Sequence, residues 1–416
     1  MQKKNIFFAH SGGVTAVVNT IAAAVITEAK NHPELINKVL VGRNGILGAI
    51  NEELIDTSSM QTSELNILAQ TPGSSFGSCR FKLKNLTDNK HEYERIIEVF
   101  KAHDIGYFLY NGGNDSQDTT FKIWQMSQTM NYPLTCIGIP KTVDNDLAIT
   151  DCCPGFGSVA KYAAIAMKEA SLDVASMAAT STKVFVLELM GRHAGWITAA
   201  AGLASCNPAE GPHILLFPEV AFNKATFLAK VQSCVQEYGY CVIAASEGLS
   251  DENGAFLAEA NTTDVFGHKQ LGGVAPILAN IVSHELKLKT HWAVADYLQR
   301  SARHIASLCD VQQASALGKA AVTKAAAGTT GIMVTINRLQ NTPYKWQVGE
   351  ANLQDIANIE KKLPTEYMTK DKMHISNAAR EYLTPLIIGE SYPSYASNGM
   401  PEYLKPQWQL IPKKTT

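Results

Sequence analysis

Polar side chains with complementary chemistry follow one apolar run near the middle of the chain. The run 134–139 predicts a buried strand, and Pro140 should end it because proline has no amide hydrogen for a sheet. Four reactive side chains then follow within six residues, namely Lys141, Thr142, Asp144 and Asp146. A cation, a hydroxyl and two carboxylates are the groups needed to move a phosphoryl group onto an alcohol. For this segment alone, a solvated polar loop remains the alternative interpretation.

Glycine-rich turns occur at two other places where an apolar run gives way to a helical pattern. These are Ser11-Gly-Gly13 and Asn111-Gly-Gly-Asn-Asp-Ser116. Such turns open phosphate sites because bare amides and a helix N-terminus face the anion. Neither turn has the Gly-x-Gly-x-x-Gly or Walker pattern, which disfavours a dinucleotide dehydrogenase. The loop 70–84 is rich in small residues and contains Arg80, which suits a phosphate, although a solvated loop is again the alternative.

Apolar runs and helical patterns alternate along the chain. We expect strands at 5–9, 38–42, 105–110, 134–139, 183–189, 213–217, 240–246 and 331–336. We expect helices at 16–31, 92–103, 117–130, 158–175, 223–238, 276–287 and 301–327. This order predicts an α/β fold with mostly parallel, doubly wound sheets, in which ligands bind beyond the strand C-termini. Nearly all the polar loops lie at those ends, which indicates one composite site.

Composition narrows the class of protein. The 416 residues are 46% hydrophobic and 18% charged, with net charge −2, as in ordinary globular proteins of two or three domains. A near-neutral balance gives no electrostatic footprint for nucleic acid or membrane partners. The eight cysteines include no Cys-x-x-Cys pair, and no apolar run is long enough for a signal peptide or a membrane span. We therefore expect a cytoplasmic protein.

Four loops in a fixed order carry a family resemblance. They are Ser11-Gly-Gly, Gly112-Gly-x-x-Ser, Pro140-x-Thr-x-Asp-Asn-Asp and Met190-Gly-Arg. Over roughly residues 5–360 the chain resembles the 6-phosphofructokinases. The resemblance implies two Rossmann-like domains with the active site in the cleft between them. It predicts a phosphoryl-donor domain (1–150 plus about 300–340), a sugar-phosphate domain (151–299 plus part of 340–363) and a C-terminal wrapping extension (364–416).

Two positions indicate the phosphoryl donor. ATP-using members of the family resemble this chain but have glycines at the positions of Asp115 and Lys141. Glycine lets a bulky nucleotide lie against the backbone, whereas an aspartate there fills the space and repels phosphates. A lysine at 141 supplies a cation for a short anion without a nucleoside. The resemblance therefore implies inorganic pyrophosphate as donor and fructose 6-phosphate as acceptor.

The resemblance also implies a role for each site residue. Asp144 is the expected general base, with Thr142 and Asp146 orienting the acceptor hydroxyl and the metal–phosphate complex. Pyrophosphate is assigned to Gly12, Gly13, Arg80, Asp115, Ser116 and Lys141. The sugar phosphate is assigned to Met190, Gly191, Arg192, Glu247, Tyr297 and Arg300, the last two binding its 6-phosphate.

A metal ion and a second subunit complete the expected site. The cofactor implied is Mg²⁺, held either by Asn114 and Asp115 or mainly by pyrophosphate oxygens and waters. A homodimer or homotetramer is implied, in which a neighbouring subunit lends Lys183 and a second cation, His291 or Lys289, to the sugar phosphate. An ATP-dependent phosphofructokinase and a catalytically silent sugar-phosphate-binding regulator remain the alternatives. No nucleotide effector is expected.

Overall fold

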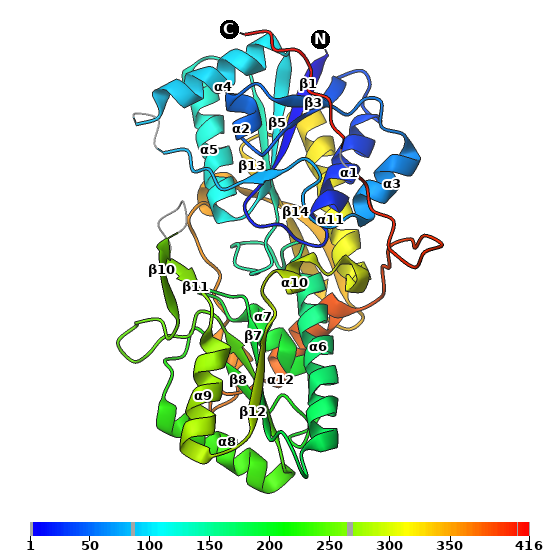
Figure 1. The fold of residues 1–416 in the computed structure, drawn as a ribbon. Helices are drawn as coiled ribbons and strands as arrows, with labels where there is room; N and C mark the ends of the chain where they lie inside the picture. The colour runs from blue at the N-terminus through cyan, green and yellow to red at the C-terminus, as the bar shows by residue number, and fades with distance from the viewer. Residues whose placement is uncertain (1–2, 85–87, 264–268, 406, 416) are drawn as a thin grey trace. The chain divides into compact units, whose positions relative to one another are not determined.

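The computed structural model describes residues 3–84, 88–263, 269–405 and 407–415. The chain forms two units, each with its own sheet and core (Figure 1). Unit 1 comprises Met1–Gly155, Leu308–Glu360 and Glu390–Thr416. Unit 2 comprises Phe156–Ser307 and Lys361–Gly389. Residues 341–360 thus belong to unit 1, and the expected extension 364–416 is divided between the two units.

Unit 1 is built on an eight-stranded sheet whose main path runs β14-β13-β6-β5-β1-β2-β3, with β4 beside β1. The strands are β1 (Lys4–Ser11), β2 (Ile36–Gly42), β3 (Leu54–Asp56), β4 (Ser78–Cys79), β5 (Ile105–Gly112), β6 (Thr135–Pro140), β13 (Ile332–Gln340) and β14 (Lys345–Asn352). The pairings are parallel except β2 with β3 and β13 with β14. The predicted α/β class and the strand end at Pro140 are confirmed.

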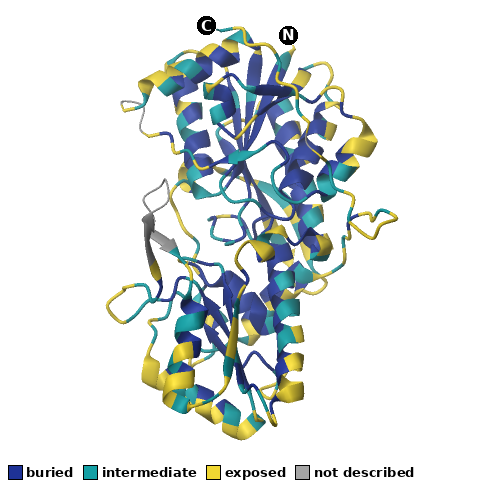
Figure 2. Ribbon diagram, in the orientation of Figure 1, coloured by how far each residue is buried: buried dark blue, intermediate teal, exposed yellow. Residues whose placement is uncertain are grey.

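Within the described ranges, six helices belong to this unit. They are α1 (Val18–Ala29), α2 (Leu47–Ile50), α3 (Thr62–Gln70), α4 (Lys90–Ala102), α5 (Asn114–Thr129) and α11 (Leu308–Ala326). Strand β1 is buried from Asn5 onward, because helices cover both faces of a parallel sheet. Inside, the ring of Phe7 stacks on Phe108 with centroids 5.6 Å apart. Figure 2 shows the central strands in dark blue and exposed residues on the outer surfaces of the helices, whereas the edge strand β14 has no buried residue.

Unit 2 holds a smaller, fully parallel sheet of order β12-β7-β9-β8. Its strands are β7 (Val184–Leu189), β8 (Ile214–Leu216), β9 (Cys241–Ser246) and β12 (Thr290–Val294). Its helices are α6 (Phe156–Met177), α7 (Trp196–Ala201), α8 (Lys224–Tyr238), α9 (Val274–Leu286), α10 (Asp296–Ser301) and α12 (Asn377–Leu383). A separate hairpin, β10 (Glu259–Thr263) with β11 (Lys269–Leu271), was not predicted.

One predicted helix was wrong at its start. The segment expected to be helical from residue 301 contains the end of α10, a 3₁₀ turn (Arg303–Ile305) and only then α11 from Leu308. The backbone leaves helical geometry at Ala302 (ψ 66°) and again at Ala306 (ψ 140°), which interrupts the hydrogen-bond ladder. Because the segment is rich in alanine, its sequence does not reveal that the helix is interrupted where the chain passes from unit 2 to unit 1.

In the part of the chain that the structure describes, no helix combines the length and the apolar character needed to cross a membrane.

Candidate active site

Lys141 joins the loop 140–146, which we call the central loop, to the first glycine turn of unit 1. Its ammonium nitrogen lies 2.7 Å from the carbonyl oxygen of Ser11 and also donates to the carbonyl of Gly13, and the residue is only 2% exposed. Gly12, between them, has φ +75°, a left-handed conformation that glycine adopts without strain. The predicted cation and the predicted glycine turn therefore meet, with the lysine under the turn.

Half-buried and buried side chains alternate along the central loop. Thr142, Asp144 and Asp146 are half-buried, whereas the intervening Val143 and Asn145 are buried. The Asn145 side chain accepts a hydrogen bond from the Cys153 amide at 3.0 Å, which ties the loop down. The Thr142 hydroxyl accepts from the Asp144 amide at 3.1 Å. The alternation thus places the predicted base, hydroxyl and second carboxylate on one side of the loop.

The second glycine turn meets the central loop at the start of α5. Asn114, the first residue of that helix, donates its side-chain amide to a carboxylate oxygen of Asp146 at 3.2 Å. Asp115 pairs with Lys82 at 2.8 Å, and the pairing raises the pKa of Lys82. Ser116 is buried, with its hydroxyl packed beside Gly112. The helix N-terminus, one carboxylate and one ion pair therefore lie together at the end of β5.

The donor set beside Asn114 suits a hard cation with few protein ligands. The side-chain oxygen of Asn114 is buried and has no hydrogen-bond partner among the described residues. The amide nitrogen of the same side chain donates to the Asp146 carboxylate, and amide and carboxylate oxygens are ligands that Mg²⁺ accepts while retaining waters. Within the described ranges, no cluster of three or more His, Cys, Asp or Glu residues is placed to hold a metal by itself. The residues present therefore fit a Mg²⁺ ion that is coordinated mainly by its phosphate ligand.

The small-residue loop before Arg80 lies directly against the first turn. The Ser78 hydroxyl donates to the Gly12 carbonyl at 2.7 Å, and the Gly12 amide donates to the Cys79 carbonyl at 2.9 Å. Arg80 follows, exposed at the end of β4. Burial, and then the charge of Lys141, lower the pKa of His10 to about 3, so this imidazole is neutral. The loop that leads to Arg80 and the turn at Gly12 are therefore joined by hydrogen bonds, and we call the two together the rim of the candidate site.

In unit 2 the predicted sugar residues gather at the C-terminal ends of β7 and β9. Gly191 (φ +135°) donates its amide toward Glu247 at 3.4 Å and accepts from the Ser246 hydroxyl. A side chain at 191 would meet the Ala194 carbonyl at 2.7 Å, so the close turn needs glycine. Burial raises the pKa of Glu247, while the Gly191 amide and the charge of Arg192 oppose that shift. The arrangement offers an amide, a carboxylate and a guanidinium to one polyol.

The predicted 6-phosphate pair lies on one short helix, α10. The Arg300 guanidinium is 3.8 Å from the centre of the Tyr297 ring, which is 59% exposed. Stacking holds the guanidinium in one orientation. Lys183 is not brought to this group, because it precedes β7 whereas Met190 follows it, about 20 Å away at the usual strand rise. Within one chain, Lys183 is therefore separate from the other predicted sugar residues.

Sequence reasoning missed the residues that hold these loops. Glu188 is 2% exposed within β7, and its carboxylate accepts from the amides of Gly273 and Ala275 at the start of α9. Gln299 is 1% exposed and accepts from the Met190 amide at 3.3 Å. A carboxylate inside an apolar strand is a signal that was available, since buried charges need partners. Gln299 gave no such signal.

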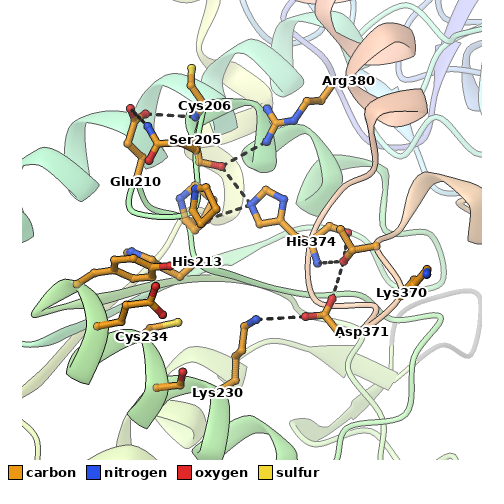
Figure 3. Close-up of a pocket in the computed structure, with 17 residues that line it drawn as sticks. Ser205, Cys206, Glu210, His213, Lys230, Cys234, Lys370, Asp371, His374 and Arg380 are labelled. Atoms are coloured by element: carbon orange, nitrogen blue, oxygen red, sulfur yellow. Dashed lines mark hydrogen bonds and ion pairs between the residues drawn. The ribbon is translucent and has the colours of Figure 1, made fainter.

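A cavity in unit 2 does not contain the predicted site residues. It has a volume of about 610 Å³, and Figure 3 shows Arg380, Ser205 and His374 on one side of it and the Lys230–Asp371 ion pair on another. The His374 ring approaches the Ser205 hydroxyl and the Pro212 carbonyl, each at 3.1 Å. None of its lining residues was assigned a role from the sequence. The candidate active site is therefore formed by the strand-end loops and not by this cavity.

Comparison with known proteins agrees with the loop geometry. The family described as Phosphofructokinase matches residues 5–325. A pyrophosphate–fructose 6-phosphate 1-phosphotransferase of Methylococcus capsulatus is 54% identical over 414 residues, covering 100% of this chain and 98% of the relative.

Two solved structures are also similar over the whole chain. The pyrophosphate-dependent phosphofructokinase of Marinobacter aquaeolei has 56% identity and a TM-score of 0.91, with 99% of this chain and 98% of that one covered. That of Nitrosospira multiformis has 53% identity and a TM-score of 0.92, with 100% and 99% covered. The chain belongs to the phosphofructokinase family.

Proposed function

We propose that the protein transfers a phosphoryl group from inorganic pyrophosphate to the C1 hydroxyl of fructose 6-phosphate, forming fructose 1,6-bisphosphate and phosphate in glycolysis. The observation that carries the choice of donor is the position of Lys141. Its ammonium group lies under the Ser11–Gly13 turn, 3.6 Å from where a side chain at Gly12 would begin. A cation at this point favours a compact anion. The pyrophosphate-dependent relatives from Methylococcus, Marinobacter and Nitrosospira support the same donor.

On the donor side we assign pyrophosphate to the rim formed by Gly12, Gly13, Arg80 and Lys141, together with Asp115, Ser116 and the first turn of α5. The helix N-terminus provides amide dipoles that favour an anion. We assign Mg²⁺ to Asn114 and Asp146, with most of its ligands coming from phosphate and water. When bound, Mg²⁺ neutralises charge on the phosphate oxygens. Asp115 then acts chiefly by holding Lys82 at the rim.

On the acceptor side we assign Asp144 as the base that takes the proton from the C1 hydroxyl. Thr142 and Asp146, on the same side of the loop, orient that hydroxyl and the donor. We assign binding of the sugar hydroxyls to Met190, Gly191, Arg192 and Glu247. We assign binding of the 6-phosphate to Tyr297 and Arg300. These residues line the strand ends of unit 2. Catalysis then consists of positioning and charge neutralisation, as phosphoryl transfer generally requires.

We further propose that the enzyme is at least a homodimer in which a neighbouring copy supplies Lys183 and either Lys289 or His291. The edge strand β12 supports this, because Trp292 and Val294 on it are 49% and 37% exposed. An edge strand with exposed apolar side chains is a typical protein interface. Sedimentation or light scattering would test it: a monomeric mass at micromolar concentration with full activity would contradict the proposal. We also propose a cytoplasmic location, in keeping with a glycolytic substrate.

Initial rates with fructose 6-phosphate and Mg²⁺ test the function directly, with pyrophosphate compared against ATP. Turnover with pyrophosphate and not with ATP is the expected result. Turnover with ATP alone would overturn the donor assignment. Binding of both substrates without turnover would favour a silent sugar-phosphate-binding regulator instead.

A further inference from the structure

A segment near the C-terminus packs against the rim of the pyrophosphate site. Residues 394–415, which we call the tail, belong to unit 1 although they follow the unit 2 segment Lys361–Gly389. Figure 1 shows the tail in red, passing beside α3 and α1 and ending beside β1 and β3. The one tryptophan of this segment, Trp408, donates its indole Nε1–H to the carbonyl of Ser75 at 2.6 Å. Ser75 belongs to the loop that leads to Arg80.

Ser75 is held from two sides. From α1, Asn19 accepts the Ser75 amide at 3.1 Å and donates to the Ser75 hydroxyl at 3.0 Å. Asn19 is fully buried and also donates to the carbonyl of Gly73 at 2.7 Å. The remaining polar group of Ser75, its carbonyl, is the one that Trp408 binds. Asn19 and Trp408 together thus satisfy the amide, hydroxyl and carbonyl of a single loop residue.

The aromatic surface of Trp408 covers the next residue of the loop. Its ring stacks on Phe76 with centroids 4.6 Å apart and an interplanar angle of 25°. Phe76 is 2% exposed, so the tail helps to bury it. Phe76 also lies beside the His10 ring of β1, with ring centroids 6.4 Å apart and an interplanar angle of 60°. The side chain is therefore clamped between the tail and β1.

Three hydrogen bonds, together with the backbone of residues 74–78, connect this clamp to the site rim. His10 donates from Nδ1 to the Ser74 hydroxyl at 2.7 Å, and that hydroxyl donates to the Gly77 carbonyl at 2.6 Å. Ser78 then donates to the Gly12 carbonyl at 2.7 Å. A displacement of residues 74–77 would therefore reach the glycine turn over Lys141. Sub-ångström placement of such groups is what positioning catalysis depends on.

We propose that Trp408 is a positioning residue for pyrophosphate: it fixes the loop 74–78 and, through that loop, the glycine turn and Arg80. The inference rests on the proposed function, since it assigns the rim to pyrophosphate. The network from Trp408 to Gly12 is built from residues of unit 1, whereas the residues assigned to the sugar phosphate belong to unit 2. The effect of removing Trp408 is therefore expected on the donor and not on the acceptor.

The tail has anchors that do not involve Trp408, so a substitution there leaves it attached. The Leu404 amide donates to the Thr71 hydroxyl at 2.9 Å, and the Ile411 amide donates to the Leu54 carbonyl at 2.9 Å. Farther on, the Thr415 amide donates to the Glu52 carboxylate at 3.2 Å. Trp408 can therefore be tested without detaching the segment that carries it.

Two substitutions separate the hydrogen bond from the stack. Trp408→Phe removes the indole donor and keeps an aromatic ring, and Trp408→Ala removes both. Leu410→Ala is the control, because Leu410 lies two residues away on the tail and is 39% exposed. For each variant the KM of pyrophosphate, the KM of fructose 6-phosphate, kcat and the thermal midpoint are measured. The same is done in reverse with phosphate and fructose 1,6-bisphosphate.

The KM of pyrophosphate should rise about fivefold in Trp408→Phe, because one hydrogen bond is lost. It should rise about tenfold or more in Trp408→Ala, because the hydrogen bond and the aromatic ring are both lost. The KM of fructose 6-phosphate should stay within about twofold, as should both values in Leu410→Ala. In reverse, the KM of phosphate should rise and that of fructose 1,6-bisphosphate should not. Equal changes in both KM values, or a lower thermal midpoint with unchanged kinetics, would overturn the positioning role. A wild-type enzyme that does not use pyrophosphate would overturn the proposed function and this inference together.

Discussion

The ammonium nitrogen of Lys141 lies 2.7 Å from the carbonyl oxygen of Ser11, a residue 130 positions earlier in the chain. This contact joins the loop after β6 to the turn after β1, which are not adjacent strands in the sheet because β5 lies between them. One side chain therefore both supports the turn and brings positive charge to it. The consequence is that a change at 141 alters geometry and charge together.

Replacing Lys141 by glycine should raise the KM of pyrophosphate by about 10–100-fold, the range for loss of a charge-assisted hydrogen bond. The double variant Lys141→Gly with Asp115→Gly should in addition acquire measurable turnover with ATP, because both obstacles to a nucleotide are removed. Lys84→Ala, an exposed lysine of the neighbouring loop, is the matched control. A double variant that uses neither donor, while still folded, would count against the steric argument.

Asp144→Asn should lower kcat by about 10²–10⁴-fold with little change in either KM, since it removes the base and retains the shape. Initial rates measured in both directions check this. Glu94→Gln, a carboxylate on the surface of α4, should leave kcat unchanged. A wild-type kcat in Asp144→Asn would move the role of base to another group.

Arg300→Ala should raise the KM of fructose 6-phosphate by about 10–100-fold and leave that of pyrophosphate unchanged. The reason is that the guanidinium, stacked on Tyr297 at 3.8 Å, is placed to bind the 6-phosphate. Arg300→Lys should give an intermediate value, because a lysine keeps the charge and loses the planar fork. Equal losses in the two variants would indicate that stacking, and not charge, is what matters.

Glu52 predicts a pH-dependent stability for unit 1. Burial alone would raise its pKa, but hydrogen bonds from the Lys414 amide, Thr415 and His103 lower the pKa to about 2. A carboxyl whose pKa is lower in the folded state stabilises that state above its unfolded value of 4.5, and the contribution disappears as pH falls from 4.5 to 2. The shift corresponds to about 3 kcal/mol.

Denaturant unfolding of the wild type and Glu52→Gln, from pH 7 to pH 3, checks this expectation. The two proteins should differ most at pH 7, and the difference should shrink below pH 4.5, where the unfolded chain binds a proton at this carboxyl and the folded protein does not. Glu53→Gln, at the adjacent half-buried position, is the control. A difference that stays constant with pH would show that Glu52 does not carry the charge assigned to it.

Local chemistry explains which parts of the fold were predictable. Pro140 ends β6 as expected, because its missing amide hydrogen is a property of one residue. The glycine turns and the loop 140–146 were likewise found from short patterns at strand ends. The break at Ala302 was missed because alanine favours a helix, and only tertiary contacts decide otherwise.

Contacts between distant segments were beyond sequence reasoning. Nothing near Trp408 indicates that its indole meets Ser75, 333 residues away, and the tail was expected only to wrap. The direction of Lys141 toward the Ser11 carbonyl was also not foreseen, since a cation on a loop was expected simply to face the anion. In both cases the residue type could be interpreted from the sequence, but the distant residue that it contacts could not be predicted.

The separation between Ser75 and Trp408 has a consequence for biosynthesis. A ribosome adds about 5–20 residues per second, so Trp408 is made roughly 17–67 s after Ser75, the time needed for the 333 residues that separate them. During that interval Phe76 lacks the ring that covers it, and the strands β13 and β14 of the same sheet are also still to come. Because the tail follows the last segment of unit 2, Lys361–Gly389, unit 1 acquires its final contacts only after unit 2 has been completely translated.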